Sequence, residues 1–172
     1  MDEDRFSDFY SAQFADVWRF ARRRTESGED ADDVTAETFA VAWRRRADIP
    51  ADAGRLWLFG VARNVLGDQA RGWSRRRASD VRIEAEPDRV ERDGADGAAA
   101  RVDLARAWRE LSAADREVLA LVAFDGLTAA QAAEVLGCRR SAFAMRLGRA
   151  RTRLTLALDP TGSGELLLWT GA

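Results

Sequence analysis

The stretch from Gly137 to Leu154, GCRRSAFAMRLGRARTRL, gathers side chains that can bind a polyanion. It holds six arginines and no acidic residue, although the whole chain has a net charge of -2. Guanidinium groups pair with phosphates and with the edges of guanine bases, so this composition suits nucleic-acid binding. The alternative is an ordinary helix face that only meets water. We favour the first interpretation because the run follows a glycine typical of helix ends.

The positions of these arginines along a helix divide them into two groups. The first turn would hold Arg139, Arg140 and Ser141, from which side chains can reach base edges in the major groove. The later arginines lie better for phosphates. These assignments give six DNA-binding residues: Arg139, Arg140, Ser141, Arg146, Arg149 and Arg153. The apolar residues of the stretch recur at helical spacing, and we expect them to be buried. They are Phe143, Leu147, Ala150 and Leu154.

A second basic cluster ends the helical pattern that runs from Leu56 to Arg77. Asn64, Asp68 and Arg71 share one face of this helix, at steps of four and three. Its apolar residues fall on another side and are expected to face a core. They are Leu58, Val61, Ala62, Val65 and Leu66. Two separate basic helices would let one chain contact DNA at two places.

The residues that are missing exclude several kinds of chemistry. The chain has no histidine, which removes Ser-His-Asp and Cys-His catalysis and nearly all zinc ligand sets. It also lacks a glycine-rich phosphate loop, so we expect no catalytic residue, metal or cofactor. Carboxylate-only sites remain open, since the chain has 29 acidic residues. The single cysteine, Cys138, and the absence of a long apolar run or secretion signal predict a cytoplasmic protein without a membrane segment.

The charge distribution indicates two small helical domains in an all-α chain. Residues 79–100 hold seven acidic residues and three arginines, with Pro87, Gly94 and Gly97 as helix breakers. We interpret this segment as a flexible acidic linker. The predicted organisation is therefore an N-terminal domain at 1–78, the linker at 79–100, a second domain at 101–158 and a tail at 159–172.

The second domain is predicted to contain a helix-turn-helix unit between Thr128 and Leu154. Ser112 and Thr128 are each followed three residues later by a residue that can complete a helix N-cap, Asp115 and Gln131. Gly137 would end the first helix of the unit in a left-handed conformation. The second helix would then enter the major groove of DNA.

Three motifs in this order resemble bacterial RNA polymerase sigma factors of the extracytoplasmic-function group. They are DADDVTAETFAVAWRR, WLFGVARNVLGDQARGWSRRR and LTAAQAAEVLGCRRSAFAMRLGRARTRL. The resemblance covers about Phe6 to Leu158. It implies that the first domain corresponds to sigma region 2 and the second to region 4, held on separate parts of a promoter by core RNA polymerase.

The resemblance also implies roles for individual residues. The helix matching Asp30 to Arg46 would dock on the polymerase, with Asp33, Glu37 and Phe39 at the acidic and aromatic positions of the motif. Phe39 could equally be an ordinary core residue. The −10 promoter element would be read and melted by residues of the following helix, with the loop 48–55: Asn64, Asp68, Arg71, Arg75 and Arg76. The −35 element would be read by the helix from Arg139, and an anti-sigma partner is common in such proteins.

Some residues depart from the family pattern. Ala36 replaces the common glutamine of the polymerase-docking helix. Residues 142–145 replace the usual Thr-Val-Lys-Ser run of the recognition helix, so the −35 sequence cannot be read from this chain. Two other functions stay open at this point. A stand-alone dimeric helix-turn-helix regulator would need palindromic operators, and a small α-helical enzyme would need a catalytic constellation.

Overall fold

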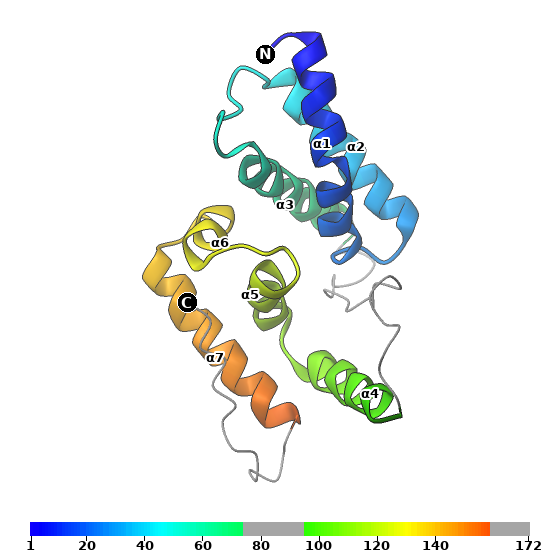
Figure 1. Cartoon of the computed structure of the whole chain (residues 1–172), viewed down its shortest axis with the longest axis vertical. Helices are drawn as coiled ribbons and strands as arrows, with labels where there is room; N and C mark the ends of the chain where they lie inside the picture. Colours follow the sequence, from blue (N-terminus) through cyan, green and yellow to red (C-terminus); the bar gives the residue numbers. More distant parts are fainter. Residues whose placement is uncertain (74–94, 159–172) are drawn as a thin grey trace.

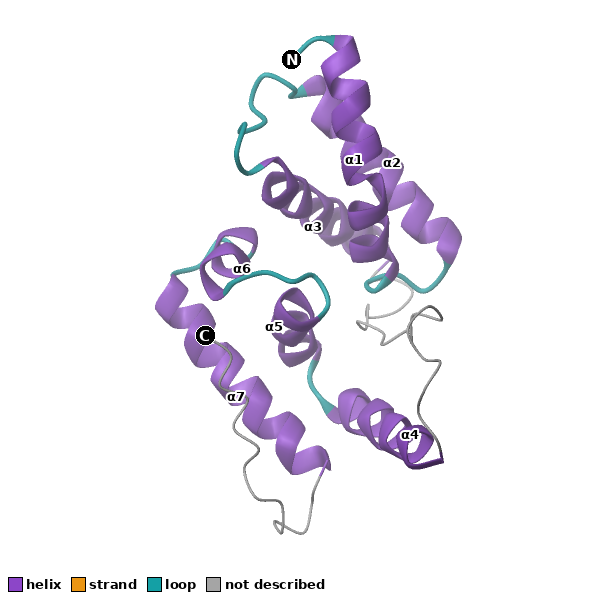
Figure 2. Cartoon of the chain, in the orientation of Figure 1, coloured by secondary structure: helices purple, strands orange, loops and turns teal. Residues whose placement is uncertain are grey.

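The computed structural model describes residues 1–73 and 95–158, and every regular element in these two ranges is a helix (Figure 2). The all-α prediction is therefore confirmed. The tail at 159–172 and most of the expected linker lie outside the described residues.

The N-terminal domain consists of three helices, which lie together in Figure 1. They are α1 (Glu3–Arg22), α2 (Gly28–Arg44) and α3 (Gly54–Trp73). The side chains of Asp2 and Ser27 cap the first two helices by accepting hydrogen bonds from backbone N–H groups in the first turns. Acidic residues in those turns interact favourably with the positive end of each helix dipole.

The core of this domain forms where the apolar sides of its three helices meet. Val17 and Phe20 of α1 are fully buried, and so is Leu58 of α3. Two aromatic side chains nearer the start of α1 are less buried: Tyr10 and Phe14 are 40% and 38% exposed. Both rings pack on Phe39 of α2, but nothing in the described chain covers their outer sides.

The second domain consists of four helices: α4 (Ala95–Glu110), α5 (Ala113–Ala123), α6 (Ala129–Val135) and α7 (Arg140–Leu158). The start of α4 differs from our expectation. It begins at Ala95, before the predicted domain start at Arg101, and Gly97 lies inside it rather than breaking it. A single glycine in a helix costs only about 1 kcal/mol relative to alanine, and its alanine neighbours offset that cost.

The helix ends of this domain confirm the predicted caps. Ser112 accepts a hydrogen bond from the backbone N–H of Asp115, and Thr128 and Gln131 form a full capping box. Gly137 has a φ of 61°, in the left-handed region that favours glycine. These caps set the short turn between α6 and α7 and complete the predicted helix-turn-helix unit.

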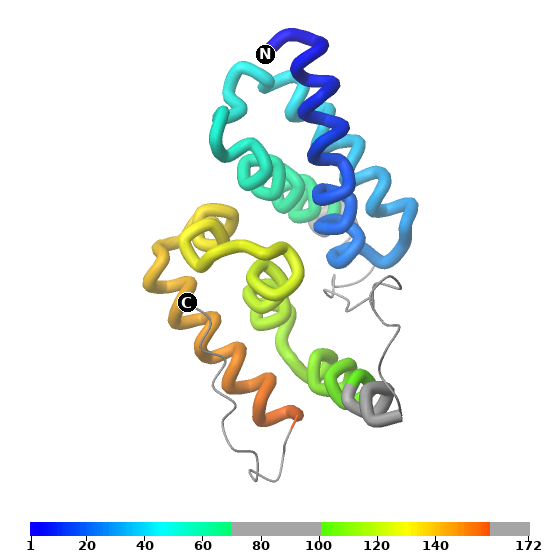
Figure 3. Tube along the Cα trace, in the orientation of Figure 1, coloured from blue at the N-terminus to red at the C-terminus, as the bar shows by residue number. Residues whose placement is uncertain are grey.

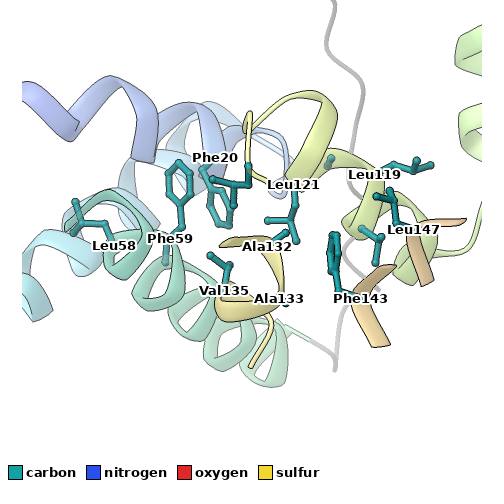
Figure 4. Packing of buried hydrophobic residues seen from close by; sticks show 14 of the residues in the cluster. Phe20, Leu58, Phe59, Leu119, Leu121, Ala132, Ala133, Val135, Phe143 and Leu147 are labelled. Atoms are coloured by element: carbon teal, nitrogen blue, oxygen red, sulfur yellow. The ribbon is translucent and has the colours of Figure 1, made fainter. Parts of the chain in front are cut away.

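The two domains touch, which we did not expect from a picture of two modules held apart. Helix α6 packs against α3, and the tube in Figure 3 shows the α5–α6 segment lying along the first domain. Buried side chains of both domains form one continuous hydrophobic cluster (Figure 4). Phe20 and Phe59 stack with ring centroids 4.6 Å apart on one side of it, and Leu121 and Val135 lie on the other. The charge distribution predicted only that a flexible linker joins the domains. It could not predict this contact, because burial of apolar surface drives packing.

Candidate nucleic-acid interface

The first turn of α7 presents the predicted base-reading residues to solvent. Phe143 and Ala150 are fully buried and Leu147 is 7% exposed, so one side of α7 is fixed against the core. This packing sets the rotation of the helix about its axis. Arg139, Arg140 and Ser141 are consequently exposed at its N-terminal end. Within the described residues, neither Arg139 nor Arg140 forms an ion pair.

The later arginines of α7 are exposed too, but one of them is already paired. Nη1 of Arg153 donates to both carboxylate oxygens of Asp115, at 2.8 and 2.7 Å. Burial raises the pKa of Asp115, but the hydrogen bonds from Ser112 and Arg153, and the charges of Arg153 and Arg149, outweigh it. The net result is a pKa below the usual value, so this carboxylate is ionised at neutral pH. Arg146 and Arg149 are therefore better candidates than Arg153 for binding phosphates.

Helix α3 places the second predicted contact on its outer face. Asn64 and Asp68 are exposed, one turn apart, while Val65 between them is 7% exposed and packs inward. Arg71 lies further along the same helix. Arg75 and Arg76 lie outside the described residues. The structure thus brings Asn64 and Asp68 to one surface, next to the exposed Arg63.

The third predicted surface, on α2, is only partly as expected. Asp33 and Glu37 are exposed, and Glu37 forms an exposed ion pair with Arg44 at 3.0 Å. Phe39 is 4% exposed and packs against the rings of Tyr10 and Phe14. The aromatic surface available to a partner is therefore formed by Tyr10 and Phe14. Neither residue was predicted from the sequence, because their exposure depends on which neighbouring helix covers them.

A network of arginines around Asp125 was not anticipated from the sequence. Asp125 lies between α5 and α6, and its side chain is fully buried. Arg23 and Arg24, at the end of α1, donate to its two carboxylate oxygens. Arg55 donates to its backbone carbonyl at 2.9 Å. All three arginines belong to the first domain, so this loop residue adds polar contacts to the apolar packing between the domains.

Arg24 is the most buried arginine of this network. It also donates to Glu117 of α5 at 3.0 Å and stacks over Phe20 at 3.6 Å from the ring centroid. Burial lowers the pKa of Arg24, but the charges and hydrogen bonds of Glu117 and Asp125 raise it above its ordinary value. The guanidinium is therefore a permanent buried charge, tolerated because its partners are carboxylates.

The domain contact leaves a cleft lined by arginines from both sides. Arg63 of α3 and Arg146, Arg149 and Arg153 of α7 line it, together with residues of α5. Its volume is about 340 Å³. The predicted phosphate-binding face of α7 therefore lies opposite the helix that carries Asn64.

The described residues contain no cluster of metal-binding side chains. Among the helices of residues 1–73 and 95–158, none has the length and apolar character needed to cross a bilayer.

Comparison with family models matches both domains to one family. Sigma-70 region 2 matches residues 9–77 and Sigma-70 region 4 matches residues 101–154. The ECF RNA polymerase sigma factor SigL of Mycobacterium tuberculosis is 33% identical over 156 residues, or 89% of this chain and 88% of SigL. The RNA polymerase sigma factor CnrH of Cupriavidus metallidurans is 33% identical over 141 residues, or 76% of this chain and 74% of CnrH.

Solved structures share this fold. CnrH in complex with the cytosolic domain of CnrY matches 93% of this chain and 91% of that chain, with a TM-score of 0.63 and 29% identity. The sigma factor RpoE from Bartonella quintana, in complex with the anti-sigma factor NepR, matches 89% of this chain and 96% of that chain. Its TM-score is 0.68 and its identity 24%, which supports the fold alone.

Proposed function

Because the chain belongs to the extracytoplasmic-function group of RNA polymerase sigma factors, which direct core RNA polymerase to specific promoters, we propose how its residues divide that work. The domain at 1–78 contacts the polymerase and the −10 element, and the domain at 101–158 reads the −35 element. The observation that carries this assignment is the exposed, basic first turn of α7, fixed outward by the buried side of the same helix.

Helix α7 reads the −35 duplex with two kinds of contact. Arg139, Arg140 and Ser141 at its N-terminal end reach base edges, as in other helix-turn-helix proteins. Arg146 and Arg149 neutralise phosphates and make binding sensitive to salt. Arg153 joins them only if it leaves Asp115, because its guanidinium already donates to that carboxylate.

Helix α3 and the loop at 48–55 capture a base of the −10 element once the duplex opens there. Asn64 has both a donor and an acceptor for a base edge and is exposed next to Arg63. Unstacking one base costs a few kcal/mol, which the capture site has to offset. Asp68 and Arg71 extend the same helix, and Arg75 and Arg76 would continue the basic surface beyond the described residues.

The polymerase docks on α2 through Asp33 and Glu37, whose carboxylates face solvent and suit basic partner residues. Phe39 acts indirectly, because its buried ring supports the exposed rings of Tyr10 and Phe14. We assign the protein to the cytoplasm and to a non-catalytic role, with polymerase supplying the chemistry. The complex of CnrH with the cytosolic domain of CnrY, at 29% identity, supports an anti-sigma partner for this chain as well.

Transcription in vitro with core polymerase tests this assignment. A library of random promoter sequences, transcribed with the full chain, should yield a common −35 and −10 pair. No transcript above that of core enzyme alone would contradict the proposal.

Two matched substitutions then separate base reading from phosphate binding on α7. Arg140→Ala should cost about 1–3 kcal/mol at particular −35 positions and relax the selected sequence there. Arg149→Ala should weaken all sequences alike and reduce the salt slope of binding by about 1. Equal effects of both substitutions on every −35 sequence would rule out the split.

A further inference from the structure

The solvent side of α7 carries one large apolar side chain that is mostly uncovered. Met145 is 63% exposed. It lies on the opposite side of the helix from Phe143, Leu147 and Ala150, which pack into the core. Because those buried residues fix the rotation of α7, they also direct Met145 away from the protein. A single exposed apolar residue is common on protein surfaces, so the neighbours of Met145 decide its meaning.

Arginines flank Met145 on both sides around the helix axis. Arg146 and Arg149 lie on one edge of this surface and Arg151 on the other, and all three are exposed. The major groove of DNA has a matching pattern, because phosphates border it on both sides and base edges form its floor. A helix that sets its arginines against both rows of phosphates therefore points Met145 at the bases. Ser141, one turn before Met145, lies on the same side.

Gly148, one turn after Met145, leaves room for the bases to come close. A glycine inside a helix is less favourable than alanine, and nothing outside the local helix backbone lies within 4 Å of a Cβ added here. Packing of the described chain therefore does not require glycine at this position. A close approach between the backbone and a ligand does favour glycine. The same open space surrounds Gly60 and Gly67 of α3, the other helix assigned to DNA.

An apolar side chain at the floor of the major groove recognises one feature of the bases. The C5-methyl group of thymine is the apolar group that base pairs present there. Cytosine instead presents an N4 amino group, which would be left without an acceptor beside the thioether of Met145. Met145 therefore favours thymine in two ways: it buries the methyl group, and it offers the amino group of cytosine no good partner.

We propose that Met145 reads one thymine of the −35 duplex through the methyl group of that base. The proposal deepens the assignment of α7 to the −35 element and rests on that assignment. Arg139, Arg140 and Ser141 supply polar contacts from the first turn, and Met145 adds an apolar contact one turn further along. The thymine accordingly lies next to the base pairs that the first turn contacts.

The expected effect follows from the size of one methyl group. Replacing thymine with deoxyuridine removes this group and keeps every hydrogen-bonding atom of the base pair. Burial of one methyl-sized group corresponds to about 0.8 kcal/mol, so its loss should weaken promoter binding about fourfold. Replacing thymine with cytosine should weaken binding about tenfold, within the usual range for one mismatched base pair.

The test uses the holoenzyme, formed from the full chain and core polymerase. Promoters are taken from the random library, and each thymine of the −35 element is replaced in turn by deoxyuridine. Competition binding against a labelled promoter measures the affinity for each replacement. With the parent chain, one position should show the loss of about fourfold.

Two substitutions of Met145 then assign the effect to its side chain. Met145→Gln keeps the length of the side chain and a good helix propensity but makes its end polar. Thymine and deoxyuridine should therefore bind this variant equally at that position, whereas Met145→Leu keeps an apolar end and should retain most of the difference. The matched control is Val102→Gln, the same kind of change at an apolar residue of α4 that is 66% exposed. It should retain the full difference.

Gly148→Gln tests the close approach of α7 to the bases. The longer side chain fills the open space beside Met145 and should weaken promoter binding about fivefold or more, the lower end for a lost base contact. Circular dichroism checks the helices of each variant. Unchanged promoter binding by folded Gly148→Gln would contradict the approach that the contact of Met145 needs.

Three results would overturn the role of Met145: a −35 element in which no thymine is preferred, no position that is sensitive to deoxyuridine, or a sensitivity that persists in Met145→Gln. These results leave the assignment of α7 intact as long as Arg140→Ala changes the preferred −35 sequence. If Arg140→Ala and Arg149→Ala both leave promoter binding unchanged, the assignment of α7 itself fails. The two failures are therefore distinguishable.

Discussion

Two groups of arginines in this chain have the same side chain and opposite roles. Those of α7, such as Arg140 and Arg149, are exposed and lie on a helix whose other side is buried. Those at the end of α1 lie at the domain contact, where Arg24 is 5% exposed and pairs with two carboxylates. The difference teaches that burial and partners, rather than the density of positive charge, separate an arginine that is available to a ligand from one that holds the protein together.

Replacing one arginine of each group with glutamine tests this contrast, and the effect on stability is the largest that we predict. Arg24→Gln removes the charged partner of Glu117 and one of the two guanidinium partners of Asp125, and should lower the free energy of unfolding by about 3 kcal/mol. This value is at the lower end of the range for breaking a buried ion pair, because water can reach Asp125 when the two domains move apart. Arg149→Gln should change it by less than about 0.5 kcal/mol. Urea denaturation followed by circular dichroism measures the free energy of unfolding of both variants. Similar losses of stability in the two would contradict the contrast between buried and exposed arginines.

The turn that orients α7 gives an effect of intermediate size. Gly137 has a φ of 61° and no atom within 4 Å of an added Cβ, so Gly137→Ala tests backbone strain without a steric clash. The left-handed conformation should cost about 1–2 kcal/mol. The matched control is Gly148→Ala, on an exposed position of α7 with open space and ordinary φ, which should be neutral or slightly stabilising. Equal thermal shifts for the two variants would show that the turn is not strained.

The ion pair between Arg153 and Asp115 gives the smallest effect, and it depends on pH. The pKa of Asp115 is lowered on folding, so its contribution is complete above the unfolded value of 3.8 and is lost as pH falls through the folded value. Because Arg153 is 57% exposed, we expect less than about 1 kcal/mol.

Comparison of the parent with Asp115→Asn, by urea denaturation between about pH 6 and about pH 3, isolates this contribution. The parent should lose more stability over that range, while Asp16 affects both proteins equally. Parallel pH profiles for the two proteins would mean that Asp115 makes no net contribution on folding.

Local features of the sequence were enough to predict the elements and much of the site. The caps at Ser112 and Thr128 and the turn at Gly137 involve residues only a few positions apart. The burial of Phe143 follows from helical spacing within α7 itself. These features determine where helices begin, end and rotate, and so they also determine that Arg140 faces outward.

Contacts between distant segments could not be predicted in the same way. Arg24 and Asp125 are 101 positions apart in the chain, and either would pass for an ordinary residue near a helix end. The buried position of Phe39 and the exposure of Tyr10 likewise depend on which helix covers them. Helix α4 starts before the predicted domain boundary because alanines in this segment favour a helix, although its glycine and acidic residues had led us to predict a linker.

The sequence by itself determined the all-α class, the helix-turn-helix unit and the outward side of α7, because spacing and capping act over one or two turns. Only the tertiary structure decided that the two domains close on each other and that one set of arginines is used to hold them. The physical reason is that burial is a property of packed neighbours: a charge becomes structural only when the folded chain removes water from it and supplies an opposite charge.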